Sequence, residues 1–286
     1  MLIANNRRNE RTAAQVAEFW GKSLDKRDWY NISDQGGNKA ELLIYDVIGW
    51  PWIEAADLVR ELAMIDADEI TVRINSPGGD VFDGLAIHHA LVQHPAKIIT
   101  VNEGLAASIA SIIYMAGDER RNIQAGHVMI HRAWTIAVIN SVEAATMADL
   151  LDRTDRSLAG IYASRTGKPL NKILEMMTAE TWFIGDEATD AGFADAIINS
   201  NPAQIAAGIT PDIFSHAPES LHAILTGGDQ DEPTKRKIER ALRDAGLNQQ
   251  EAKGVLAGGW AAKDQRDVDN AELLASVNAI TNKFKK

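Results

Sequence analysis

The sequence contains no cysteine among its 286 residues. This absence excludes disulfide bonds, thiolate nucleophiles and cysteine-ligated zinc sites. A covalent nucleophile in this protein must therefore be serine, threonine or another group, and a reducing compartment is compatible with the composition.

Long apolar segments are absent as well. No run of about 18 apolar residues occurs, so the sequence offers no candidate for a transmembrane helix. The first twenty residues, MLIANNRRNERTAAQVAEFW, lack the apolar stretch of a secretory signal. We expect a cytoplasmic protein that does not bind a membrane.

Positive charge is scarce: 29 lysine and arginine residues face 40 acidic ones, which gives a net charge of −11 and a pI near 5.1. A general nucleic-acid binder needs clustered basic side chains to contact phosphates, so the composition argues against this class. Hydrophobic residues at 45% and charged residues at 24% are typical of a globular protein.

Strand-like and helix-like patterns alternate between residues 38 and 198. We expect strands at 40–49, 69–75, 97–101 and 127–131, and helices at 51–65, 81–94, 103–117 and from about Val142 to Arg165, with Ser141 as N-cap and Gly167 as C-terminal stop. Such alternation predicts an α/β domain whose parallel strands are joined by right-handed crossovers.

The two ends of the chain differ from this domain. Residues 1–37 form a polar lead-in, and residues 199–232 are rich in glycine, proline and asparagine, which indicates a linker. Residues 233–286 predict short helices. The basic run KRKIER makes a DNA-reading helical tail an alternative, but interspersed acidic residues favour a protein-interaction or assembly segment.

Two glycines follow the second expected strand in INSPGGD, residues 74–80. Glycine permits positive φ and leaves backbone N–H groups uncovered, so one of these N–H groups could supply half of an oxyanion hole. A tight turn without function is the alternative. The segment alone does not decide between them.

The next unit, EGLAASIASIIYMAG, places Ser108 at the start of an apolar segment. A serine there is a possible nucleophile, with the Ile109 N–H as a second oxyanion donor, or else a packing or capping residue. His131 ends the next apolar strand, within reach of a neighbouring strand end. His127 begins that strand and is a weaker candidate for a general base.

Three segments in this order, RINSPGGDVFDGLAIHHAL, GLAASIASIIYMAG and VMIH, resemble the motifs of the Clp protease proteolytic subunit (ClpP) family. The resemblance covers residues 38–198. It implies a ClpP/crotonase-like fold of repeated ββα units, with Ser108 as nucleophile, His131 as general base, and Gly79 and Ile109 as the oxyanion hole. It implies no cofactor and no metal, and the chain contains no P-loop motif.

The third member of the triad departs from the family pattern. Family members usually carry aspartate where this sequence has Glu180, before the strand WFI. Glutamate can orient a histidine as aspartate does, with a longer reach. Asp152 and Asp155 on the long helix are the alternatives. Ser111 is expected to be a small packing residue.

The lead-in, AETWF and the long C-terminal segment resemble the ClpP-related head maturation (prohead) proteases of tailed phages and prophages. This likeness implies a serine endopeptidase that cleaves scaffold, portal or capsid proteins inside an assembling procapsid in the host cytoplasm. It also implies a homo-oligomeric ring, a heptamer or two stacked heptamers, with the long helix at the interface between rings.

Three other functions remain open. The chain could be a cellular ClpP-like peptidase supplied by an AAA+ unfoldase, an enzyme of the enoyl-CoA hydratase superfamily, or a non-catalytic scaffold subunit that retains the fold. The seven tryptophans are scattered and predict core or interface area. Only Trp134, three residues after His131, is expected to border a substrate groove.

Overall fold

The computed structural model describes residues 10–20, 22–23, 29–52, 54–137, 139–199, 214–218 and 221. The chain divides into two units, Met1–Gly228 and Asp229–Lys286. The predicted helical tail at 233–286 and most of the predicted linker lie outside the described residues.

One mixed sheet organises the described part of the chain. Its strands are β1 (Tyr30–Gly36), β2 (Lys39–Tyr45), β3 (Glu69–Ser76), β4 (Lys97–Ala107), β5 (Glu119–Ile123), β6 (His127–Ile130), β7 (Thr181–Ile184) and β8 (Ala196–Ile198). The order is β1-β2-β3-β4-β5-β8, and β6 pairs with both β4 and β7. The β1–β2 and β6–β7 pairs are antiparallel and the others parallel, as predicted for the central strands.

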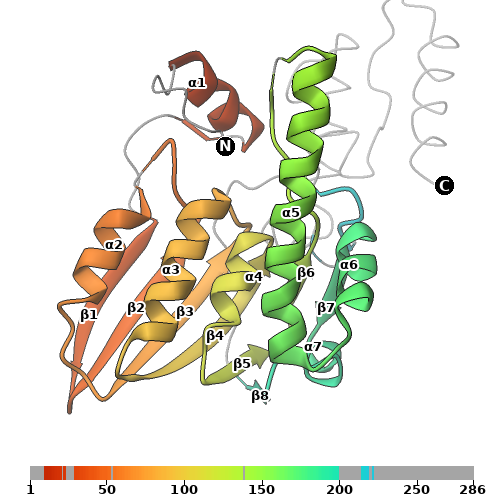
Figure 1. Ribbon diagram of the computed structural model, residues 1–286. Helices are drawn as coiled ribbons and strands as arrows, with labels where there is room; N and C mark the ends of the chain where they lie inside the picture. Colours follow the sequence, from red (N-terminus) through yellow and green to blue (C-terminus); the bar gives the residue numbers. More distant parts are fainter. Residues whose placement is uncertain are drawn as a thin grey trace, which may run out of the picture. The chain divides into compact units, whose positions relative to one another are not determined.

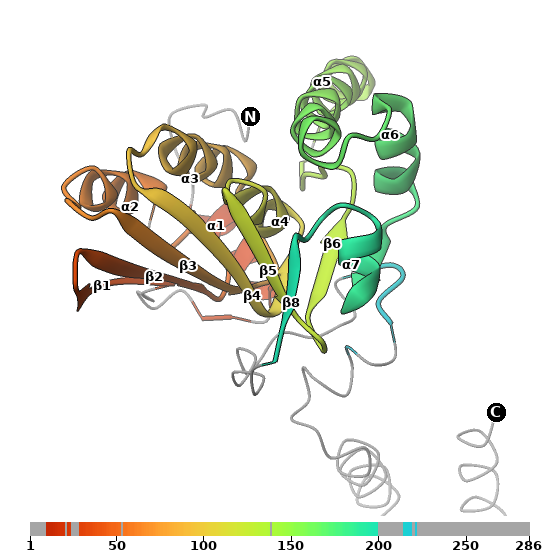
Figure 2. The same cartoon turned by 90° about the horizontal axis from the view of Figure 1, so that it is seen from below.

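Seven helices accompany the sheet in the described residues: α1 (Glu10–Phe19), α2 (Ala55–Leu62), α3 (Val81–Gln93), α4 (Ile109–Tyr114), α5 (Ser141–Thr166), α6 (Leu170–Thr178) and α7 (Asp186–Asp190). Helices α2, α3 and α4 cover one face of the sheet (Figures 1 and 2). The core between these layers contains fully buried Ile44, Ile74, Ile87 and Ile113. Burial of such side chains contributes about 1.5–3 kcal/mol each.

Strand β4 is longer than predicted, and its two halves pair with different neighbouring strands. Its first half pairs with β5 from Ile99, whereas its second half pairs with β6, with Leu105 beside His127. The predicted helix over 103–117 was wrong in its first part, since β4 continues to Ala107 and α4 begins at Ile109. The strand is buried on both faces, so small residues replace the alternating pattern that identifies a strand.

Helix α5 begins at Ser141, one residue earlier than predicted. Its N-cap is Asn140, not Ser141: the Asn140 side chain accepts from the N–H groups of Val142 and Glu143, and the Glu143 side chain closes a capping box. Gly167 ends the helix with a left-handed φ of 70°, as expected. None of the described helices is long and apolar enough to cross a membrane.

Candidate active site

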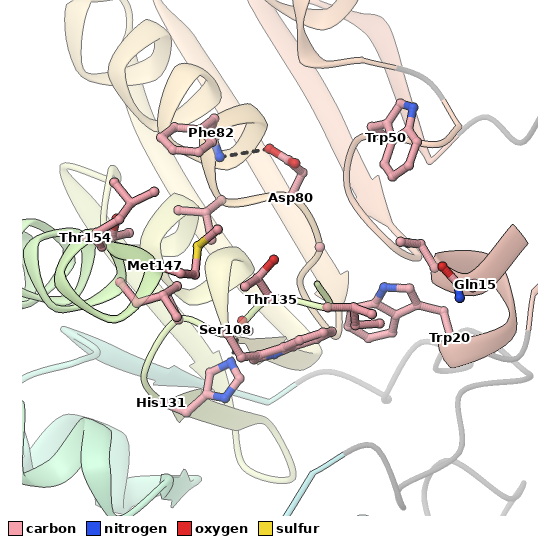
Figure 3. Close-up of a pocket in the computed structure, with 18 residues that line it drawn as sticks. Gln15, Trp20, Trp50, Asp80, Phe82, Ser108, His131, Thr135, Met147 and Thr154 are labelled. Atoms are coloured by element: carbon pink, nitrogen blue, oxygen red, sulfur yellow. Dashed lines mark hydrogen bonds between the residues drawn. The ribbon is translucent and has the colours of Figure 1, made fainter. Parts of the chain in front are cut away.

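Ser108 and His131 meet at the carboxyl ends of two adjacent parallel strands. Ala107 lies beside Met129 in the β4–β6 register, and the Ser108 N–H donates to the Met129 carbonyl over 3.0 Å. The side chains then meet, with Ser108 Oγ 2.7 Å from His131 Nε2 (Figure 3). This is the distance at which an imidazole can accept the hydroxyl proton of a serine.

The backbone at Ser108 is strained. Its φ of 54° and ψ of −129° lie in a region that residues other than glycine rarely adopt, at a cost of about 1–3 kcal/mol. Gly78 makes this turn possible, because a Cβ there would lie 2.7 Å from the Cβ of Ser108. Strain held by its surroundings is common at catalytic residues.

Ser111 supports the turn at Ser108. Its N–H and hydroxyl both donate to the Ser108 carbonyl, over 3.0 and 2.6 Å, and its hydroxyl lies 2.7 Å from that of Tyr162 on α5. Ser111 is fully buried, as a packing residue would be. In addition, it connects the strained turn to the long helix.

The glycine loop after β3 is fixed by a neighbouring segment. Ile48 donates its N–H to the Gly78 carbonyl over 2.8 Å and accepts from the Asp80 N–H over 2.9 Å. Neither bond uses the N–H of Gly79. A Cβ on Gly79, whose φ is 154°, would lie 2.0 Å from the Ile48 oxygen, so this position requires glycine.

The two candidate oxyanion residues, Gly79 and Ile109, both lie near Ser108. Gly79 lines the same pocket as Ser108 and His131. Ile109 is the first residue of α4, and N–H groups of a first helical turn have no acceptor within the helix. These are the two N–H groups that the sequence indicated for an oxyanion hole.

The surroundings of His131 favour the neutral imidazole. Burial lowers the pKa of His131 below its ordinary value, and the charges of Glu180 and Asp155 oppose this effect without cancelling it. A neutral imidazole at neutral pH can accept a proton from Ser108.

Glu180 lies in the turn between α6 and β7, with a φ of 49°. Its carboxylate accepts from the backbone N–H groups of Ser215 and His216 over 2.9 and 2.6 Å, and from Trp182 Nε1 over 3.3 Å. No hydrogen bond joins it to His131 within the described residues. Its influence on His131 in this arrangement is that of a nearby charge.

Asp155 on α5 contacts the segment that follows His131. Its two carboxylate oxygens accept from Arg132 Nε over 2.6 Å and from the Ala133 N–H over 2.7 Å. Asp152 accepts from the same guanidinium over 2.8 Å. Sequence reasoning did not identify Arg132. The available signal was the positive charge directly after the candidate base, together with the two acidic residues Asp152 and Asp155 on one helix.

The candidate site lies in a largely apolar pocket. Its lining includes Val16 and Trp20 from the α1 region, Phe82, Trp134, Met147 and Leu150. Figure 3 shows side chains from the α1 region on one side of Ser108 and His131 and side chains of α5 on another. Trp134 is 43% exposed, and its ring centroid lies 4.5 Å from that of Phe19.

Within the described residues, no group of three or more histidine, aspartate or glutamate side chains is placed to hold a metal ion. His127, the weaker candidate base, is buried at the start of β6, and its Nδ1 lies 2.9 Å from the Ala125 carbonyl. The structure therefore brings His131 to Ser108, and the register places His127 beside Leu105 instead.

The sequence profile of the Clp protease family matches residues 26–201, which is 176 of the 286 residues. The chain belongs to the Clp protease family. Its fold is the ClpP-like α/β fold, and the family is one of serine-type peptide hydrolases that form homo-oligomeric rings.

Curated relatives agree with this membership. ATP-dependent Clp protease proteolytic subunit 3 of Rhodococcus jostii (strain RHA1) is 34% identical over 147 residues, which cover 51% of this chain and 73% of the relative. ATP-dependent Clp protease proteolytic subunit 1 of Corynebacterium jeikeium (strain K411) is 29% identical over 152 residues, with coverages of 51% and 81%. The proteolytic subunit of Pleurastrum terricola is 34% identical over 134 residues, with coverages of 46% and 68%.

Proposed function

We propose that this protein is a serine endopeptidase with Ser108 as nucleophile and His131 as general base. The observation that carries the proposal is the 2.7 Å separation between Ser108 Oγ and His131 Nε2 beside a glycine loop. In the first step, His131 takes the Ser108 proton while Oγ bonds to the peptide carbonyl carbon. The oxygen that becomes negative is bound by the N–H groups of Gly79 and Ile109.

The tetrahedral intermediate then collapses. The imidazolium of His131 gives its proton to the leaving amine, the C–N bond breaks, and an acyl-Ser108 ester remains. A water molecule, deprotonated by the same imidazole, attacks the ester carbonyl carbon; the bond to Oγ then breaks, the carboxylic acid product leaves, and the imidazolium returns its proton to Ser108. Glu180 stabilises the imidazolium in these steps through its charge, since its hydrogen bonds go to other groups in the described arrangement.

Two alternative functions fit these contacts less well. An enzyme of the enoyl-CoA hydratase superfamily has no need of a serine and histidine in hydrogen-bond contact. A non-catalytic scaffold subunit has no need of the strained φ of 54° at Ser108. The retained strain and contact favour an active peptidase.

We propose that the subunits form a ring system in which α5 contacts another copy. Val142 at the start of α5 is 75% exposed, whereas Leu158, Ala159 and Tyr162 in the second half are buried. An exposed apolar residue on a long helix is consistent with an interface. The heptameric or doubly heptameric state remains part of the proposal.

We further propose that the substrates are scaffold, portal or capsid proteins of an assembling phage head. The support is the resemblance in sequence together with the 85 residues that follow the matched region, 286 minus 201. The competing function, degradation of chains delivered by an AAA+ unfoldase, is favoured by the ATP-dependent relatives. Trp134 borders the pocket, and its substitution is expected to change peptide preference while ring formation persists.

A fluorophosphonate probe tests the chemistry, and co-expression tests the substrate. Wild type is expected to gain the mass of one probe at Ser108, whereas Ser108→Ala gains none; Ser33→Ala, altered at a serine on β1 outside the pocket, is the matched control. Co-expression with neighbouring capsid and scaffold genes is expected to give discrete cleavages that Ser108→Ala abolishes. Extensive degradation that requires an unfoldase would instead support the cellular function, and an unlabelled wild type would contradict the peptidase.

A further inference from the structure

Asp155 is a carboxylate in an apolar environment. It is 1% exposed and lies on the same face of α5 as the buried residues Leu158, Ala159 and Tyr162. Removing a charge from water is costly unless hydrogen bonds and an opposite charge replace the lost hydration. The groups that bind the Asp155 carboxylate therefore indicate which part of the structure it stabilises.

Within the described residues, the hydrogen-bond partners of Asp155 are Arg132 and Ala133, the two residues after His131. One oxygen accepts from Arg132 Nε over 2.6 Å and the other from the Ala133 N–H over 2.7 Å. Strand β6 ends at Ile130, so His131 is the first residue beyond the β ladder. Asp155 thus anchors the chain where the strand hydrogen bonds stop.

We propose that Asp155 is a positioning residue for His131, which it holds against Ser108 by fixing the Arg132–Ala133 backbone to α5. The inference rests on the proposed peptidase function and deepens it. Proton transfer depends on a separation of 2.7 Å between Ser108 Oγ and His131 Nε2. A displacement of about 1 Å at a reacting group can reduce a rate by about 10²-fold.

Charged groups reach His131 from two elements besides its own segment. Asp155 lies on α5 and Glu180 in the turn before β7, and both act to raise the pKa of His131. Arg132, on the His131 segment, pairs with Asp155 and also with Asp152. Of these acids, Asp155 is the one that also binds the backbone beside the base.

The test compares Asp155→Asn with Asp149→Asn, a control on the same helix whose carboxylate is 62% exposed and pairs with Arg153. The second-order rate of fluorophosphonate labelling at Ser108 is measured from pH 5 to 8 on folded protein. Asp155→Asn is expected to label at least about tenfold more slowly at its optimum. Its acid midpoint is expected to fall, because loss of the carboxylate lowers the pKa of His131. Asp149→Asn is expected to match wild type within about twofold, as exposed pairs contribute little.

A merely structural role would lower stability without moving the acid midpoint of the folded fraction. If Asp155→Asn does not fold, Arg132→Gln replaces it, since it removes the ion pair and keeps the Ala133 contact; slower labelling is again expected. Wild-type rate and midpoint in either folded variant would overturn the proposal.

A second measurement does not depend on activity. The His131 ring is titrated by NMR in wild type and in Asp155→Asn, with its signal assigned by loss in His131→Gln. A lower pKa in the variant supports the proposal, and an unchanged pKa contradicts it. Failure of wild type to label would contradict the peptidase function, whereas unchanged behaviour of the variant in a labelled protein would contradict only the role of Asp155.

Discussion

Ser108 Oγ and His131 Nε2 lie 2.7 Å apart because β4 and β6 are parallel neighbours that end at the same edge of the sheet. A hydrogen bond from the Ser108 N–H to the Met129 carbonyl fixes this relation in the backbone. The glycine loop after β3 ends at the same edge, since β3 pairs in parallel with β4. Three strand ends therefore bring together Ser108, His131 and the glycine loop, the proposed nucleophile, base and backbone donor.

The pH dependence of acylation follows from the burial of His131. Burial lowers the pKa of His131, so the imidazole remains neutral and able to accept a proton below the ordinary histidine value of about 6.5. We expect the labelling rate to rise with pH through an acid midpoint below about 6.5 and to be nearly constant near pH 7. Labelling rates measured with the probe across a pH series give this midpoint. A midpoint above about 7 would contradict the argument that burial lowers the pKa of His131.

Substitution of Gly79 should impair the chemistry. In Gly79→Ala, the new Cβ would overlap the Ile48 oxygen, at 2.0 Å, so the loop must shift and move the proposed oxyanion donor. Loss of one such donor reduces kcat by about 10²–10³-fold. The control is Gly160→Ala on α5, where the added Cβ meets nothing within 4 Å. Peptidase assays measure kcat for both variants. Full activity in Gly79→Ala would show that the Gly79 N–H is not an oxyanion donor.

Glu180→Gln distinguishes a charge effect from a triad role. The Glu180 carboxylate is bound by Ser215 and His216 in the described structure, so we expect a modest rate loss, below about tenfold, and a lower acid midpoint. Removal of a triad carboxylate that holds the histidine reduces kcat by about 10⁴-fold. Steady-state kinetics across pH separate the two roles. A loss of that larger size would show that Glu180 reaches His131 during turnover.

Stability should depend on the ion pair between β5 and the residue before β8. Arg120, whose side chain is 7% exposed, donates to Asp195 through Nε over 2.9 Å and through a terminal nitrogen over 2.6 Å. Removal of one partner of a buried pair costs about 3–5 kcal/mol; since Asp195 is 40% exposed, we expect about 2 kcal/mol for Asp195→Asn. Urea unfolding at fixed protein concentration measures this, and Asp149→Asn should change little.

The same pair gives a pH signature. Partial burial acts to raise the pKa of Asp195, but hydrogen bonds and charge from Arg120 outweigh it, and the pKa lies below its ordinary value. The stabilisation is therefore complete above the unfolded-state pKa of about 3.9 and is lost as pH falls through the lower folded-state value. The stability difference between wild type and Asp195→Asn should shrink in that acidic range. A difference that stays constant to pH 2 would contradict this origin.

The sequence predicted the central parallel strands and their crossovers because these segments carry strong periodic or β-branched patterns. It predicted the proximity of Ser108 and His131 because adjacent parallel strands end at one edge. It did not predict that β4 continues to Ala107, since small residues in a strand buried on both faces show no alternation. Long-range hydrogen bonds, such as those of Glu180 to Ser215 and His216, have no local sequence signal.

Asp155 illustrates a signal that was present in the sequence. It follows the spacing of the buried residues Leu158, Ala159 and Tyr162 on α5, and an acid on an apolar helix face predicts a buried partner. The identity of that partner, Arg132, depends on how the loop after β6 crosses the helix. That crossing depends on the tertiary structure, which the periodicity of the sequence does not predict.

The central claim is that His131 activates Ser108, and one measurement tests it most directly. The rate of probe attachment to Ser108 is followed by intact mass in wild type and in His131→Gln at pH 7. We expect attachment in wild type, with a loss on the order of 10³-fold or more in the variant, because an unassisted serine hydroxyl is a poor nucleophile. Equal rates in the two proteins would contradict the account.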